Sequence, residues 1–119
     1  MTCSQARFWY SNHSNSECFP WGGAAAGTQP VQSYAPNAWG LFDMHGNVWE
    51  WCLDTPAAYS AAAVTDPFVT VGSQRVLRGG SWNNYSHYCR SAHRLGFTAG
   101  SSISDHFGFR VVLAPILVP

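Results

Sequence analysis

The sequence contains no lysine, and charged residues make up only 10% of its 119 residues, against about a quarter in an ordinary globular domain. All six cations are arginine, and six acidic residues balance them to a formal net charge of zero. Recognition of a phosphate backbone depends on clustered positive charge, so we expect no nucleic-acid partner. A sparsely charged surface favours burial against other molecules, so we expect an assembly or a homo-oligomer.

Long hydrophobic runs are also absent. No stretch reaches the roughly 18 apolar residues that a membrane-spanning helix needs. The first residues, MTCSQARFWYSN, lack the apolar core and cleavage site of a signal peptide. We therefore expect no membrane span and no secretory leader. The length favours a single domain, 1–119, that begins with an irregular segment, 1–27, rich in Ser, Asn, Gly and Ala.

Several chemical signatures are missing as well. The four cysteines, Cys3, Cys18, Cys52 and Cys89, include no C-x2-C pair, and the five histidines show no HxH or HxxxH spacing. A zinc knuckle and a histidine metal centre are therefore not expected. No phosphate loop, nucleophile motif or paired-carboxylate arrangement occurs either. The cysteines form two disulfides or remain buried thiols, and their spacing does not choose among the pairings.

What the sequence does have is aromatic and apolar side chains, at 15% and 46% of residues. Alternation of charged and apolar residues predicts a strand over 75–78, and a second strand is expected over 107–113. Gly46-Asn47, between two apolar runs, predicts a turn joining extended arms. We expect a loop over 55–74. Residues 81–106 follow no period, and such a long irregular segment between strands is typically functional.

Three blocks carry a family resemblance: PNAWGLFDMHGNVWEWCLD at 36–54, RVLRGGSWNN at 75–84 with CRSAHR at 89–94, and GFRVV at 108–112. Their order and spacing resemble the C-terminal half of the formylglycine-generating enzyme family, also called the sulfatase-modifying factor type. The resemblance implies an α+β protein with a compact C-type lectin fold, short antiparallel strands and much irregular loop. It covers roughly residues 28–113.

The enzymes of this family use a C-x4-C cysteine pair, shortly after the GGS block, where copper binds. This chain has only Cys89 in that stretch, and one thiol does not supply a two-thiolate copper site. We therefore expect no enzymatic activity and no required cofactor, with Cys52 and Cys89 buried or paired with each other. A copper-dependent oxidase, or a degenerate sensor or adaptor domain, remains the alternative.

Calcium is the one metal that the resemblance leaves open. In the family a calcium ion is held around the motif that matches DMHGNVWE, by the oxygen ligands that a hard cation prefers. Carried over to this chain, the ligands are Asp43 and Glu50 through their side chains and Gly46 and Val48 through their carbonyls. The alternative is that Asp43 and Glu50 cap the turn and pair with Arg78 or Arg110.

The chain most resembles one subset of the family, the variable proteins of diversity-generating retroelements. In these proteins, altered adenines in AAC or AAT codons leave NNY codons, which never encode Lys, Glu, Gln, Met or Trp. Those five types supply 14 of the 119 residues but none of residues 83–107, where composition alone would place about three. This absence favours a variable ligand-binding loop region, 81–107.

The mixture of Tyr, Ser, His and Asp in this region is also typical of an antibody-like binding surface. The resemblance thus implies a non-enzymatic display protein that binds a protein or cell-surface ligand from a virion or cell surface. Arg90, Arg94 and Arg110 are expected to tie loop carbonyls to the scaffold. The predicted ligand-binding residues are Asn84, Tyr85, Ser86, His87, Tyr88, His93, Leu95, Phe97, Ser102, Ser104, Asp105, His106 and Phe107.

Overall fold

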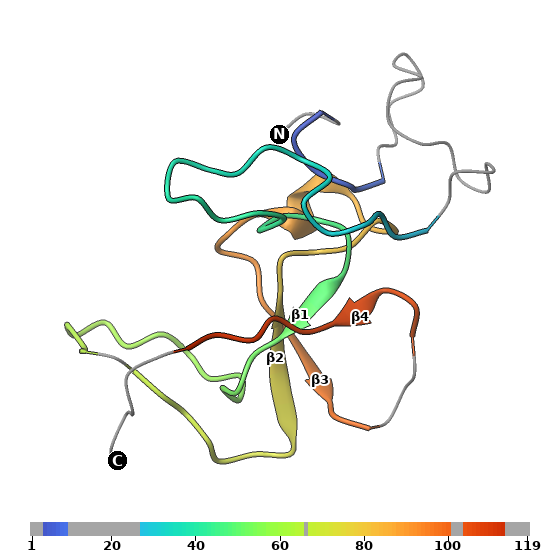
Figure 1. Ribbon diagram of the computed structural model, residues 1–119. Coiled ribbons are helices and arrows are strands. Elements are labelled where there is room, and N and C mark those ends of the chain that lie inside the picture. The colour runs from blue at the N-terminus through green and yellow to red at the C-terminus, as the bar shows by residue number, and fades with distance from the viewer. Residues whose placement is uncertain (1–3, 10–26, 66, 101–103, 114–119) are drawn as a thin grey trace.

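A four-stranded mixed sheet forms the centre of the molecule (Figure 1). The computed structural model describes residues 4–9, 27–65, 67–100 and 104–113. The strands are β1 (Trp49–Trp51), β2 (Gln74–Arg78), β3 (Leu95–Thr98) and β4 (Phe107–Gly108), in the order β3-β2-β1-β4. Strand β2 is antiparallel to both neighbours, and β4 is parallel to β1. The described helical content is one 3-10 helix, η1 (Ser86–Cys89). Short strands and much loop were predicted; the parallel pair was not.

The predicted strand at 75–78 is confirmed as β2, which begins one residue earlier. Its neighbouring residues Val76 and Leu77 are 3% and 0% exposed. Adjacent strand residues point to opposite faces, so both faces of the sheet are covered at β2. This explains why β2 lies inside the sheet and carries part of its core.

The predicted strand over 107–113 is mostly wrong, because β4 ends at Gly108. Strand β1 has only three residues, and its pairing with β4 joins Trp49 to Phe107 and Glu50 to Gly108. Beyond Gly108 the side chains of Phe109 and Val111 are 77% and 84% exposed. The apolar pattern of this segment is that of a strand, but the described chain offers it no further partner.

The interpretation of 81–106 as irregular throughout is also wrong. It contains η1 and β3, and β3 pairs with β2 over four residues, from Gln74 with Thr98 to Leu77 with Leu95. A glycine usually weakens a strand, so Gly96 argued against predicting a strand at β3 from the sequence. Here Gly96 is required by packing, since a Cβ atom at this position would lie 2.7 Å from Cγ of Pro56.

The predicted turn at Gly46-Asn47 is confirmed, with φ angles of 76° and 65°. Its arms do not form a hairpin: β1 follows the turn, but the residues before it form no strand. Gly46 instead bridges to Arg7, and its N–H donates to the Gly79 carbonyl at 2.7 Å. The turn therefore joins segments distant in the sequence.

Asn47 makes four hydrogen bonds to three different segments. Its N–H donates to the Arg7 carbonyl at 2.7 Å, and its own carbonyl accepts from the Trp82 N–H at 2.9 Å. Its side chain pairs with the backbone of Gln29, accepting at 2.9 Å and donating at 3.2 Å. Asparagine tolerates the left-handed backbone that this turn requires. One residue thus connects the N-terminal segment, the 27–30 loop and the segment after β2.

The N-terminal segment is part of the core. Ala6 and Phe8 pack with Cys89, all three at most 3% exposed, and Trp9 bridges to Tyr85. This segment, residues 27–45 and η1 lie at one end of the sheet in Figure 1, and residues 52–65 and 67–73 lie at the other. The loop predicted over 55–74 is confirmed over 55–65 and 67–73. No helix among the described residues is long and apolar enough to cross a membrane.

Replacing Gly46 by Ala should destabilise the fold far more than replacing Gly40 by Ala. Both glycines have φ near 75°, at 76° and 74°, so the backbone cost of adding a side chain is similar, roughly 1 kcal/mol. A Cβ on Gly46 would collide with the Arg7 carbonyl, whereas one on Gly40 would meet no atom within 4 Å. Chemical denaturation measures the difference, and equal losses would show that the Gly46 contact is dispensable.

Candidate ligand-binding surface

Two groups of aromatic rings come together from the region predicted to bind ligand. In the first, Tyr85 lies 4.3 Å from Trp9 between ring centroids and stacks at 5.7 Å on His87. His87 lies 4.2 Å from Tyr88, whose ring is 5.0 Å from that of His93. Tyr85 precedes η1, His87 and Tyr88 lie in it, and His93 follows it. With Trp9 of the N-terminal segment, these rings form a continuous row.

The second group lies across the sheet. Phe97 of β3 and Phe107 of β4 lie 5.1 Å apart, although their strands are at opposite edges, and both contact the Trp51 ring, at 6.5 and 5.8 Å. The sheet must therefore curl so that its edges approach over Trp51. His106 extends the group, at 4.8 Å from Phe107.

Strand alternation explains why the two groups share one face. Trp49 and Trp51 are two residues apart on β1, so they point to the same side of the sheet. Trp49, 2% exposed, contacts Tyr88 at 6.4 Å and His93 at 5.8 Å, while Trp51 contacts the second group. We call the set the ring surface; its members are Tyr85, His87, Tyr88, His93, Phe97, His106 and Phe107.

The other predicted binding residues fall around this surface. Leu95 is half-buried and shares its side of β3 with Phe97. The Ser104 hydroxyl lies 2.6 Å from Nδ1 of His106, and the exposed Asp105 pairs with the same nitrogen at 3.2 Å. Ser86 is half-buried in η1. Ser102 lies outside the described residues.

Asn84 differs from the rest because its side chain is already occupied. Its Oδ1 accepts from Nε1–H of Trp49 at 2.7 Å and from the Ser81 hydroxyl at 2.6 Å. Its carbonyl accepts from the Trp9 N–H at 2.8 Å. Asn84 thus positions the tryptophan beneath the ring surface, a structural role that sequence pattern alone does not reveal.

The arginines hold the loops differently from what was expected. Arg90 is exposed, and in the described residues Arg94 bonds to no carbonyl but stacks on Tyr59, 3.8 Å from the ring centroid. Arg78 holds the loop carbonyls instead, since its Nη1 donates to that of Ser91 at 2.8 Å and, more weakly, to that of His93 at 3.5 Å. The expectation holds for Arg110, which donates to the Asp43 carbonyl at 3.2 Å.

The four residues predicted for calcium do line one cavity, of about 390 Å³. Arg110 also lines this cavity, and its guanidinium donates hydrogen bonds of 2.7 to 3.1 Å to both carboxylate oxygens of Glu50. The Glu50 hydrogen bonds raise the pKa of Arg110. Oδ2 of Asp43 accepts from the Gln32 N–H at 2.6 Å.

These contacts do not fit a calcium ion as they stand. A cation would have to displace Arg110, because the guanidinium already neutralises the Glu50 carboxylate. The contacts are those of the alternative in which Glu50 pairs with Arg110. No group of three His, Cys, Asp or Glu suited to a metal occurs within the described ranges. Calcium binding itself stays an untested prediction.

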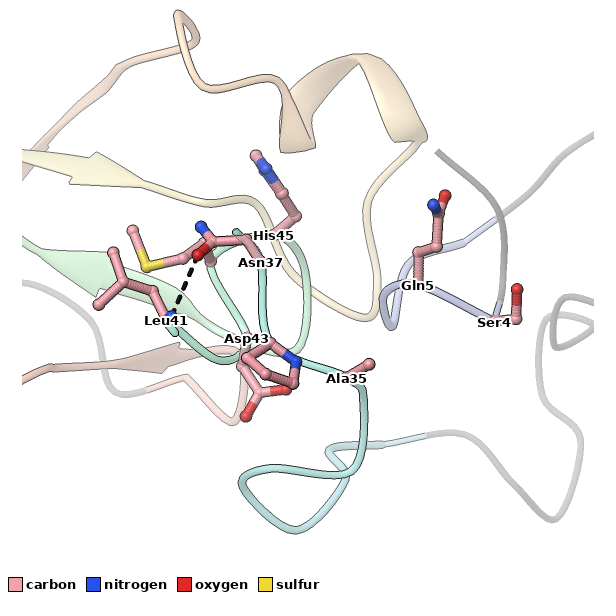
Figure 2. Close-up of a pocket in the computed structure, with 9 residues that line it drawn as sticks. Ser4, Gln5, Ala35, Asn37, Leu41, Asp43 and His45 are labelled. Carbon is pink, nitrogen blue, oxygen red and sulfur yellow. Dashed lines mark hydrogen bonds between the residues drawn. The ribbon is translucent and has the colours of Figure 1, made fainter. Parts of the chain in front are cut away.

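Sequence reasoning missed a larger cavity, of about 410 Å³, between the N-terminal segment and residues 35–45 (Figure 2). The Asn37 side chain accepts from the N–H groups of Trp39 and Leu41, at 2.9 and 3.1 Å, and so shapes one wall. His45 in another wall places Nδ1 2.7 Å from the Cys89 carbonyl, so Nδ1 carries the proton and donates. Much of the lining thus maintains the fold.

Cys52 and Cys89 are free thiols, so they do not pair with each other. Cys89 is fully buried, as expected, whereas Cys52 is half-buried. Burial raises the pKa of the Cys89 thiol to about 11. The residues at the C-x4-C spacing from Cys89 are Asn84 and Arg94. Cys3 and Cys18 lie outside the described residues.

The pKa of His93 provides a test of the ring surface. Burial lowers it below the usual 6.5, and the charges of His87 and Arg90 lower it further. Replacing His87 by Gln should therefore move the titration midpoint of His93 upward. The midpoint should still not exceed that of a histidine in an unfolded peptide, because the burial of His93 remains. Proton NMR of the His93 ring measures both midpoints, and an unchanged midpoint would place His87 too far away to matter.

Comparison with known proteins gives one consistent result. A family profile for the sulfatase-modifying factor enzyme 1-like domain matches residues 3–115. The formylglycine-generating enzyme of Streptomyces coelicolor is 46% identical over 89 residues, which are 70% of this chain and 28% of the relative. A serine/threonine-protein kinase, pkn1, of Chlamydia caviae is 40% identical over 90 residues, which are 70% of this chain and 14% of the relative.

A solved structure supports both the predicted fold and the resemblance to variable proteins. Treponema denticola variable protein 1 superposes with a TM-score of 0.64 and 37% identity, covering 74% of this chain and 32% of that one. The predicted C-type lectin-type fold is therefore confirmed. The chain spans less than a third of the length of each of these relatives.

Proposed function

The chain belongs to the family of sulfatase-modifying factor enzyme 1-like domains, and on that premise we propose that it is a non-enzymatic binding protein whose ring surface is diversified by a retroelement. The observation that carries the proposal is the gathering of residues from 85 to 107 into one aromatic surface. Its likeness to a variable protein supports the same function.

The chemistry of the ring surface suits recognition of many ligands. Aromatic side chains supply contact area at low entropic cost, and Ser104 and Asp105 add adaptable hydrogen bonds. Tyr85 and His87 are exposed. Trp49, which contacts Tyr88 and His93, is held by β1 and by Asn84. Substitutions at exposed positions usually cost little stability, so these two positions can change while the scaffold stays intact.

The partner in this proposal is a protein or other ligand on a cell surface, and the chain is displayed on a virion or a cell. Its sparse charge fits attachment to an assembly rather than free diffusion. A bound calcium ion would act on the Asp43 to Glu50 turn and not on the ring surface.

Sequencing the DNA that flanks the gene tests this function directly. We expect a near-copy of the codons for residues 83–107 that differs only where the copy carries adenine, next to a reverse transcriptase gene. The differing codons should be those of the ring surface. A locus without such a repeat would contradict diversification and leave an unvaried member of the family.

The second candidate function is a copper-dependent oxidase, which the likeness to formylglycine-generating enzymes favours. Against it stand Asn84 and Arg94 at the positions where a second cysteine would be needed. A thiol whose pKa burial raises to about 11 is also a slow nucleophile, because roughly one molecule in a thousand is a thiolate at pH 8.

Thiol reactivity separates the two candidates. In a chain with Cys3, Cys18 and Cys52 changed to Ser, Cys89 should resist a disulfide reagent at pH 8 until the protein is unfolded. The parent chain, which keeps all four cysteines, should lose Cu(I) to a competing chelator. Rapid labelling of the folded chain, or retention of one equivalent of copper, would favour the oxidase.

A further inference from the structure

A smaller cavity, of about 170 Å³, lies on the sheet face opposite the ring surface. Val76, Arg78 and Arg94 line it, and strand alternation places Val76 and Arg78 on the side of β2 opposite Leu77, whose partner is Trp51. Cys52, Asp54 and Tyr59 also line it. None of these residues belongs to the predicted binding set.

Two guanidinium groups meet on one tyrosine in this cavity. Arg94 stacks on the Tyr59 ring at 3.8 Å from its centroid, and Nη2 of Arg78 donates to the Tyr59 hydroxyl at 3.2 Å. No carboxylate bonds to either arginine within the part of the chain that the structure describes. Two adjacent cations to which no carboxylate is bonded repel each other, and a bound anion would relieve that repulsion.

Arg94 has donors to spare. A guanidinium carries five N–H groups in a planar fork, and in the described residues the contact that holds it is the stacking on Tyr59. Stacking fixes the plane of the fork and leaves its edges for an acceptor. Arg78 is fixed as well, by the carbonyls of Ser91 and His93. The cation pair is therefore preorganised.

We propose that this cavity binds the carboxylate of a small, otherwise apolar acid, with Arg94 as its main partner. The planar fork of Arg94 matches a carboxylate in two-point contact. Ala57, Pro67 and Val69 complete an apolar lining. The volume is close to that of a cavity of roughly 150 Å³ that holds benzene, so it has room for a short hydrocarbon group behind the carboxylate.

Asp54 sets the charge of the ligand. It lines the same cavity, where its Oδ1 accepts from the Val69 N–H at 3.0 Å. Two arginines and one aspartate leave a single positive charge, which a singly charged carboxylate neutralises. A doubly charged phosphate would instead leave an excess negative charge beside the Asp54 carboxylate, which repels it. The acid comes from a free small molecule or from the C-terminus of a peptide, and both present the same carboxylate.

NMR titration of the intact chain tests the site. Butyrate represents the free acid and N-acetylvaline the chain terminus; N-acetylvaline amide is the uncharged control, and inorganic phosphate is the competing anion. At least one carboxylate should bind saturably and shift the signals of the Arg94 side chain and the Cys52 amide. The tighter of the two carboxylates identifies the source. Equal binding of the amide, stronger binding of phosphate, or no saturable binding would overturn the proposal.

Three variants assign the effect to the cavity. Arg94→Gln should weaken binding about tenfold, because a charge-assisted pair is lost. Arg75→Gln removes the same charge from an arginine that bonds the Gly72 and Gln74 carbonyls outside the cavity, so its affinity should stay within about twofold of the parent. Asp54→Asn should bind more tightly, since a repelling charge is gone. Equal weakening by Arg94→Gln and Arg75→Gln, in chains that melt like the parent, would show unspecific charge attraction instead.

Discussion

The hydrogen bonds of Asn47 are the constraint on which the rest of this fold depends. Through its backbone and its amide, Asn47 joins Arg7, Gln29 and Trp82, which are otherwise distant in the sequence. Within the described residues, few apolar side chains are fully buried, so polar contacts of this kind must hold the loops in place. An amide in a left-handed turn satisfies three segments at once, and no aliphatic residue can do the same.

Because these hydrogen bonds hold the loops, the side chains of the ring surface do not have to stabilise the fold. Asn84 holds Trp49 from behind, Arg78 holds the carbonyls of Ser91 and His93, and Arg110 holds Glu50. None of these bonds uses a side chain of the ring surface. The rings therefore lie on a support that does not need them, the arrangement required if one side of a protein varies and the other carries the fold. The arginine cavity on the opposite face would then be constant while the ring surface changes.

The family, the Gly46-Asn47 turn and β2 could be predicted because their signals are local: matching blocks, a turn dipeptide and an alternating strand. Strand β3 was missed because Gly96 has a packing reason, Pro56, that only the folded chain shows. The length of β4 was overestimated because apolar alternation does not reveal whether a partner strand exists. The predicted binding residues were chosen by type and position, and the curl of the sheet that brings Phe97 to Phe107 had no signal in the sequence. Likewise, Arg78 and Arg94 could be named, but not their shared contact with Tyr59.

The separation of scaffold and ring surface is most directly tested by comparing two variants in one unfolding experiment. The first changes Tyr85, His87 and Asp105 together to Ser; these are the exposed residues among the described members of the set expected to bind ligand. The second changes only Asn47 to Ala. We predict that the triple variant loses less free energy of unfolding than the single one, because it breaks no scaffold hydrogen bond. A triple variant that loses as much as Asn47→Ala, or more, would mean that the ring surface itself holds the fold, which would contradict this account.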